Sequence, residues 1–294
     1  MSGNDWVAER FEANRSHLRA VAFRMLGSAG EADDAVQECW IRVNRADAAG
    51  IDNLEGWLTT VVARICLNIL RSRTARREEA LEESTAGPRI VHSGRRSPQD
   101  EALLAESVGL AFLVVLERLT PAERVAFVLH DVFGVSFEEI ASIVDRTPTA
   151  ARQLASRARR RVRGGRTRPA ASLSGKRQTV EAFLRALRAG DIESLLAVLD
   201  SDVVRRADRV AVAAAEGREL RGARDVAQEA LTYSGAAQIA QPVVVDGDVG
   251  FVIAPGGRLR VAVRCTVRKS KITAMEVIAD PARLRTLNFG IPPD

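Results

Sequence analysis

The chemically most specialised side chains in this sequence form a run of arginines. The stretch RTPTAARQLASRARRRVRGGRTR, from Arg146 to Arg168, contains nine arginines, no lysine and no carboxylate, and the next acidic residue is Glu181. A guanidinium group is permanently charged and presents a planar fork of donors that suits phosphate oxygens and the edge of guanine. Solvated helix faces, the alternative interpretation, usually mix charges of both signs. The run therefore predicts a surface that binds duplex DNA.

The rest of the composition indicates neither metal chemistry nor a membrane. The net charge is only +5 over 294 residues, so the positive charge is local. Cys39, Cys66 and Cys265 are scattered, and no Cys/His pair has metal-ligand spacing, so we expect buried thiols, no metal and no cofactor. The polar N-terminus lacks a signal-peptide core, and the apolar run from Val108 to Leu116 is too short for a bilayer. We expect a cytoplasmic protein with no membrane partner.

The residues before the arginine run predict a helix-turn-helix. Thr120 is followed three residues later by Glu123, and Ser136 by Glu139, which is the pattern of a capping box at a helix start. A short turn then leads to Pro148, which suits the first position of another helix. Asp145, in the turn, is expected to adopt a left-handed conformation, which Asp tolerates.

The apolar spacing after Pro148 assigns two faces to the last of these helices. The inward residues are expected to be Ala151, Leu154, Ala155, Ala158 and Val162. The outward residues are expected to be Thr149, Arg152, Gln153, Ser156, Arg157 and Arg160. The N-terminal part of such a helix enters the major groove, where arginine reads guanine and glutamine reads adenine. We expect Arg152 and Gln153 to read bases, and Arg157 and Arg160 to hold phosphates.

Helical periodicity also dominates the N-terminal part of the chain, and the pattern changes after residue 175. The expected domains are 1–80, a helical bundle; 81–100, a linker; 101–165, the helix-turn-helix; 166–175, a second linker; and 176–294, an α+β domain. Within the last domain we expect helices at 176–189 and 191–199 and strands near 202–207, 238–245, 249–254 and 271–278. The clearest strand is RLRVAVRCTVRK, in which apolar residues alternate at period two.

Two separated motifs resemble the sigma-70 family, specifically its extracytoplasmic-function branch. DDAVQECWIRVNR with WLTTVVARICLNILRSRTARRE resembles region 2, and the helix-turn-helix with RQLASRARRRV resembles region 4. The resemblance implies that region 2 docks on core RNA polymerase and opens the promoter's minus-ten element, while region 4 binds the minus-thirty-five element. It therefore implies core polymerase and promoter DNA as partners.

The resemblance also implies site residues in region 2. The expected polymerase-binding residues are Asp33, Asp34, Gln37 and Glu38. The expected minus-ten residues, on the helix at 54–77, are Arg64, Asn68, Arg71, Arg73, Arg76 and Arg77. The loop at 44–54 is expected to receive an unstacked base.

Residues 176–280 resemble the cone-shaped SnoaL-like domain that one group of these sigma factors, the SigJ-like group, carries as a fused regulator. The segment DPARL resembles a motif of that group, whereas the glycine motif expected near Asp208 is missing. The expected regulatory contacts are Asp208, Asp280, Pro281 and Leu284. The tail is expected to pack against the first linker or region 2; alternatively, Leu284 and Leu287 close the C-terminal domain's own core.

Two other functions remain open at this point. A one-component regulator with a ligand-sensing domain would bind DNA without a polymerase-docking region. A SnoaL-like enzyme would need a positioned acid or base, but the C-terminal part has no histidine and offers only Tyr233 and scattered carboxylates. We therefore expect no enzyme but a sigma factor that its C-terminal domain regulates.

Overall fold

The computed structural model describes residues 3–45, 51, 53–83, 110–163, 170–211, 219–255 and 259–292. The chain divides into two compact units. The helical unit comprises residues 1–86 and 119–159, and the mixed unit comprises residues 87–118 and 160–294. None of the described helices is long and apolar enough to cross a bilayer.

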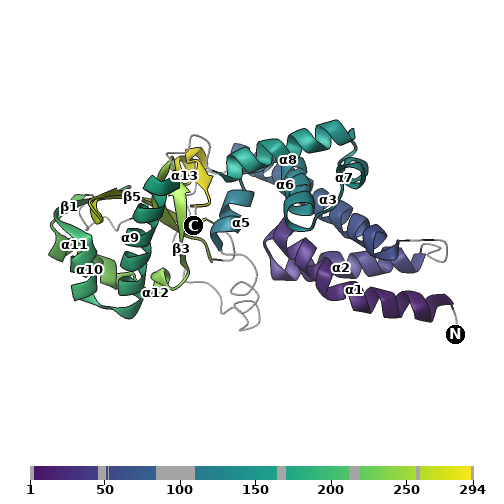
Figure 1. The fold of residues 1–294 in the computed structure, drawn as a ribbon, viewed down its shortest axis with the longest axis horizontal. Coiled ribbons are helices and arrows are strands. Elements are labelled where there is room, and N and C mark those ends of the chain that lie inside the picture. Colours follow the sequence, from purple (N-terminus) through teal and green to yellow (C-terminus); the bar gives the residue numbers. More distant parts are fainter. Residues whose placement is uncertain are drawn as a thin grey trace. The chain divides into compact units, whose positions relative to one another are not determined.

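Three helices form the first part of the helical unit (Figure 1): α1 (Gly3–Leu26), α2 (Ala29–Arg45) and α3 (Leu54–Glu83). Their apolar faces are buried against one another, as the periodicity predicts. The helix α1 ends where Gly27 adopts a positive φ of 73°. The helix α3 continues six residues beyond the expected end at residue 77. Parts of the expected base-receiving loop (residues 46–50 and 52) and most of the linker at 81–100 lie outside the described residues.

The helix-turn-helix follows, with α6 (Pro121–Phe127), the π-helical turn η2 (Val128–Val132), α7 (Phe137–Val144) and α8 (Pro148–Val162). Both capping boxes are present, at Thr120 and at Ser136. Asp145 is left-handed, with φ 56° and ψ 54°. The five expected inward residues of α8 are all buried. Each of these local predictions is confirmed.

The mixed unit is built on a seven-stranded sheet with strand order β2-β1-β6-β5-β4-β3-β7. Its strands are β1 (Leu199–Ala207), β2 (Glu219–Arg221), β3 (Ala240–Val245), β4 (Asp248–Ile253), β5 (Val261–Arg268), β6 (Lys271–Ile278) and β7 (Phe289–Gly290). Its helices are α5 (Leu110–Leu116), α9 (Ala170–Ala189), α10 (Ile192–Val198), α11 (Ala223–Thr232), α12 (Ser234–Ala237) and α13 (Pro281–Thr286). Among the described strands, β1 and β6 form a parallel pair and every other pair is antiparallel. Helical regions followed by an α+β domain are the expected fold class.

The helix α9 lies across the sheet and supplies much of the core of the mixed unit (Figure 1). The Phe183 ring stacks with that of Phe251 on β4, with centroids 6.1 Å apart. This helix begins at Ala170, inside the segment 166–175 that was expected to be a linker. Leu173 is buried there because it lies two helical turns before Val180 on the same apolar face of α9.

Both ends of the expected segment 101–165 fall in the mixed unit when the chain is divided by its contacts. The apolar helix α5 packs on β3 and β7. At the other end, the Ile291 backbone N–H donates to the Val162 carbonyl oxygen at 2.9 Å, and Arg163 forms a β-bridge with Gly290. The division between the units falls inside α8.

Candidate nucleic-acid interface

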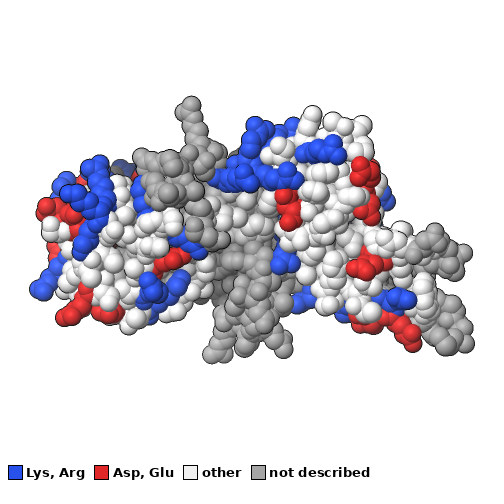
Figure 2. Space-filling view, in the orientation of Figure 1, with Lys and Arg blue, Asp and Glu red and all other residues white. Residues whose placement is uncertain are grey.

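The outward face of α8 is the first part of the candidate interface, and all six residues predicted for it are exposed. Figure 2 shows Lys and Arg side chains gathered over this helix. Arg152 lies near its start, with its guanidinium carbon 5.2 Å from the centroid of the Phe137 ring. The side chains of Arg152 and Gln153 have no hydrogen bond or ion pair within the described part of the chain, so both can offer donors to a ligand.

Tertiary structure brings carboxylates to this arginine face, although the run itself contains none. The Arg157 guanidinium lies 3.4 Å from an oxygen of the buried Glu123, and that of Arg159 lies 2.6 Å from Asp131. Glu123 comes from α6 and Asp131 from η2, and each precedes its partner arginine by about 30 residues in the chain. Because Arg157 is partly neutralised, it would have to exchange Glu123 for a phosphate on binding DNA.

The second part of the candidate interface is α3, where the predicted residues separate into two groups. Arg64, Asn68, Arg71 and Arg76 are exposed. Arg73 instead donates to the Leu26 carbonyl oxygen at 2.9 Å and forms a close ion pair with Glu31. Its guanidinium thus joins α3 to the end of α1 and the start of α2. The sequence had predicted a DNA contact for Arg73 and not this structural one. The Arg77 side chain lies outside the described residues.

A cleft of about 340 Å³ lies beside the exposed arginines of α3. Its lining comprises Arg42, Arg64, Leu67, Asn68, Arg71, Ile143 and Asp145. The Arg64 guanidinium donates to the Ser142 carbonyl oxygen of α7 at 2.9 Å, so the helix-turn-helix forms one wall. Sequence reasoning missed Arg42, which reaches the cleft from α2. Three arginines around one cleft can hold an anion such as a DNA phosphate.

The predicted polymerase-binding residues share one stretch of α2. Asp33 is paired with Arg19, at 2.5 Å, and Glu38 with Arg42, at 2.9 Å. Asp34 and Gln37 are exposed and have no such partner among the described residues. Ile41 continues this face at helical spacing with 38% of its surface exposed, and the sequence analysis did not single it out.

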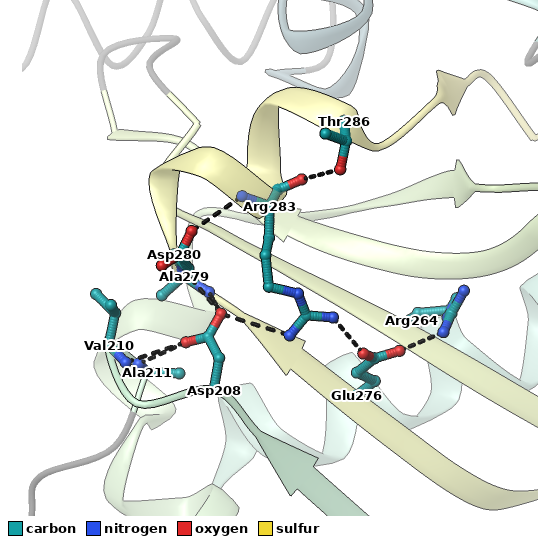
Figure 3. A network of polar contacts seen from close by, with 9 residues as sticks. All are labelled: Asp208, Val210, Ala211, Arg264, Glu276, Ala279, Asp280, Arg283 and Thr286. Carbon is teal, nitrogen blue, oxygen red and sulfur yellow. Dashed lines mark hydrogen bonds and ion pairs between the residues drawn. The ribbon is translucent and has the colours of Figure 1, made fainter.

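The predicted regulatory residues Asp208 and Asp280 lie together in the mixed unit (Figure 3). One carboxylate oxygen of Asp208 accepts hydrogen bonds from the backbone N–H groups of Val210 and Ala211, at 3.2 and 3.0 Å. The other oxygen accepts from those of Ala279 and Asp280, both at 2.9 Å. Asp208 therefore joins the segment after β1 to the start of α13.

Arg283 of α13 extends this network across the sheet. It donates to Glu276 at 2.5 Å and lies 3.8 Å from Asp208, and Glu276 also pairs closely with Arg264 (Figure 3). Partial burial pushes the pKa of Glu276 upward, but the hydrogen bonds and charges of Arg283 and Arg264 outweigh it and hold that pKa below its usual range. Glu276 is thus held as a carboxylate between two guanidinium groups.

The C-terminal tail is held by Arg118, which follows α5. The guanidinium of Arg118 donates to the carbonyl oxygens of Leu284 and Arg285, at 2.5 and 3.0 Å, and lies over the Phe289 ring at 5.0 Å. Leu284 is buried in the mixed unit and Leu287 is half-buried. Both Arg118 and the tail lie in the mixed unit. Most of the first linker lies outside the described residues.

Comparison with known proteins links these features to one family. The family model described as Sigma-70 region 2 matches residues 10–76, and that described as Sigma-70, region 4 matches residues 109–162. The chain is 34% identical over 290 residues to "Probable ECF RNA polymerase sigma factor SigI" of Mycobacterium tuberculosis, covering 98% of each chain. It is 38% identical to "ECF RNA polymerase sigma factor SigJ" of the same organism, covering 92% of this chain and 91% of the relative. The crystal structure of that organism's SigJ covers 94% of this chain and 97% of its own, at 33% identity and a TM-score of 0.45.

Proposed function

The chain belongs to the extracytoplasmic-function (ECF) sigma factors of RNA polymerase, and from that premise we propose how its residues divide the work of transcription initiation. It binds core RNA polymerase and promoter DNA, and it directs initiation at particular promoters. A one-component regulator would not need region 2, so that alternative is not favoured. The relatives are sigma factors rather than enzymes. We propose that the mixed unit of this chain is regulatory and not catalytic. We also propose that the protein works in the cytoplasm with the polymerase.

We propose that α8 reads the minus-thirty-five element. The observation that supports this is the exposed face of α8, on which Arg152 and Gln153 keep their donors free within the described residues while Arg157 is drawn toward Glu123. Arg152 and Gln153 read bases, Thr149 and Ser156 contact the groove wall, and Arg157 and Arg160 hold phosphates.

Two alanine variants test this division on a set of single-base promoter variants. Arg152→Ala should cost about 1–3 kcal/mol of binding free energy and relax the preference at one promoter position. Arg160→Ala should weaken binding to all sequences alike and flatten the salt dependence. A loss from Arg152→Ala that is equal for every promoter variant would show that Arg152 does not read a base.

On α3 we propose that Arg64, Asn68, Arg71 and Arg76 hold the strands near the minus-ten element, with Arg42 beside them. Arg73 keeps α3 in place through Glu31 and acts only indirectly. Arg64 must give up its bond to the Ser142 carbonyl oxygen when it binds a phosphate. In this arrangement α7 packs beside the cleft, and we propose that promoter DNA has to open this packing when it binds.

For polymerase docking we propose the face of α2 that carries Asp34, Gln37 and Glu38. Charge reversal at Asp34 and Glu38 should abolish the capture of core polymerase by the full chain. Glu38 forms a single exposed ion pair with Arg42, so its replacement should leave the fold intact. Unchanged capture of the polymerase by the doubly reversed variant would show that this face is not the docking surface.

For the mixed unit we propose a role that both supports and restrains the sigma regions. The supporting observation is that α5 and the end of α8, which lie within the region 4 match, are held by β3, β7 and Arg118. Transcription should be compared for the full chain, a form ending at Ile278, which lacks α13 and β7, and a form ending at Gly175. Equal transcription by all three would mean that the mixed unit does not regulate this sigma factor.

A further inference from the structure

The guanidinium of Arg152 rests on an aromatic stack within the helical unit. Its carbon lies 5.2 Å from the centroid of the Phe137 ring. The ring of His130 stacks on Phe137, with centroids 4.0 Å apart and an angle of 27° between the ring planes. His130 is itself fixed, because its Nδ1 lies 3.0 Å from the Val135 carbonyl oxygen, to which it can only donate.

Local structure also holds the stacked rings of Phe137 and His130 in place. Phe137 is the first residue of α7, and it follows directly on the capping box of Ser136 and Glu139. His130 comes from the π-helical turn η2, a distortion that brings its ring under the start of α7. Two rings anchored in this way offer Arg152 a rigid surface.

Stacking and base reading use different parts of the guanidinium. A guanidinium interacts with an aromatic ring through its flat face, so the N–H groups at its edge stay available. The Arg152 guanidinium has no hydrogen bond or ion pair within the described residues, whereas those of Arg157 and Arg159 are turned to Glu123 and Asp131. Arg152 is thus ordered without its donors being occupied.

We propose that Phe137 is a positioning residue for promoter specificity. It holds the plane of the Arg152 guanidinium so that two parallel N–H groups meet the O6 and N7 atoms of a guanine in the major groove, and His130 supports its ring. Because less side-chain freedom is lost on binding, the ordered arginine gains affinity for the correct base alone. This inference rests on the proposed role of Arg152 as a base reader.

The test measures binding of the full chain to promoters varied one base at a time, with the melting temperature as a check of folding. Phe137→Leu keeps an apolar side chain but removes the aromatic face. The preference for one base, at the position that Arg152→Ala relaxes, should fall about two- to five-fold, the size of an exposed cation–π interaction. Phe137→Tyr should retain it. In the Arg152→Ala background, Phe137→Leu should not change the preference further.

Phe133→Leu is the matched control, because that ring lies under Arg24, at 5.4 Å, instead of Arg152. It should leave the preference at this position unchanged. If Arg152→Ala relaxes one position and Phe137→Leu weakens all promoters equally or changes none, the inference is wrong and the base-reading role stands. If Arg152→Ala itself weakens every promoter alike, the base-reading role fails, and the inference fails with it.

Discussion

At the scale of single residues, a few carboxylates bind both backbone N–H groups and neighbouring arginines. The Asp208 side chain is almost buried and accepts hydrogen bonds from four backbone N–H groups of two segments. Glu123 completes a capping box and also lies beside Arg157. In both cases one carboxylate organises local backbone and neighbouring guanidinium groups, so its loss should be felt beyond its own position.

Replacement of Asp208 should destabilise the mixed unit because four donors lose their acceptor at once. We expect Asp208→Ala to cost about 2–4 kcal/mol and to lower the melting temperature by about 5–10 °C. The exposed Asp202, on the preceding strand β1, serves as the control, and Asp202→Ala should change the melting temperature little. Equal melting temperatures for both variants would contradict the structural role of Asp208.

The ion pairs of Glu276 should make the stability of the mixed unit depend on pH. The folded-state pKa of Glu276 lies below its ordinary value of 4.5, so the stabilisation is present above pH 4.5 and is lost as the pH falls through the folded-state pKa. Glu276→Gln should therefore be about 1 kcal/mol less stable than the parent at about pH 7. In denaturant unfolding below pH 4.5 the difference should shrink; a constant difference would exclude this cause.

At the scale of elements, the helix-turn-helix depends on two local devices. Its capping boxes begin α6 and α7, and Asp145 ends α7 in the left-handed region. A side chain makes this conformation costly, although Asp tolerates it better than most residues. The turn thus sets the angle between α7 and α8 at some cost in stability.

A glycine at position 145 should remove that cost. We expect Asp145→Gly to stabilise the helical unit by about 0.5–1 kcal/mol and Asp145→Ala to destabilise it by about 1 kcal/mol. The midpoint of denaturant unfolding measures both. If the glycine variant were the less stable of the two, the carboxylate of Asp145 would have to contribute more than its backbone conformation costs.

At the scale of the whole molecule, the residues that match region 4 are divided between the two units. Their first helix, α5, and the end of α8 belong to the mixed unit, where the C-terminal strand β7 and Arg118 hold them. The C-terminal tail and the last residues of α8, from Arg160 on, therefore belong to the same unit. A change in the tail should consequently be felt at the end of α8.

Loss of Arg118 should loosen the tail. Arg118→Ala removes two hydrogen bonds to carbonyl oxygens and the contact with Phe289. We expect the local opening free energy at β7 to fall by about 2 kcal/mol, which corresponds to about thirtyfold faster amide exchange at Phe289 and Gly290. Arg285→Ala, which removes an exposed side chain, should leave this exchange unchanged. Unaltered exchange in Arg118→Ala would mean that other contacts hold the tail.

The sequence by itself determined the local structure and the family. The buried face of α8, both capping boxes and the left-handed Asp145 follow from residue types at fixed short spacings, which backbone geometry converts directly into faces and caps. The order of the two sigma motifs likewise survives in the bare sequence, since it needs no knowledge of packing.

Only the tertiary structure decided which charged side chains form ion pairs or hydrogen bonds within the protein and which face outward. Glu31 occupies Arg73, Glu123 and Asp131 reach Arg157 and Arg159, and Arg118 holds a tail more than 160 residues away. Such pairs join elements that are distant in the chain, and no periodicity encodes them. They form because packing the apolar faces brings those elements together, and each guanidinium then bonds the acceptors that packing has placed within its reach.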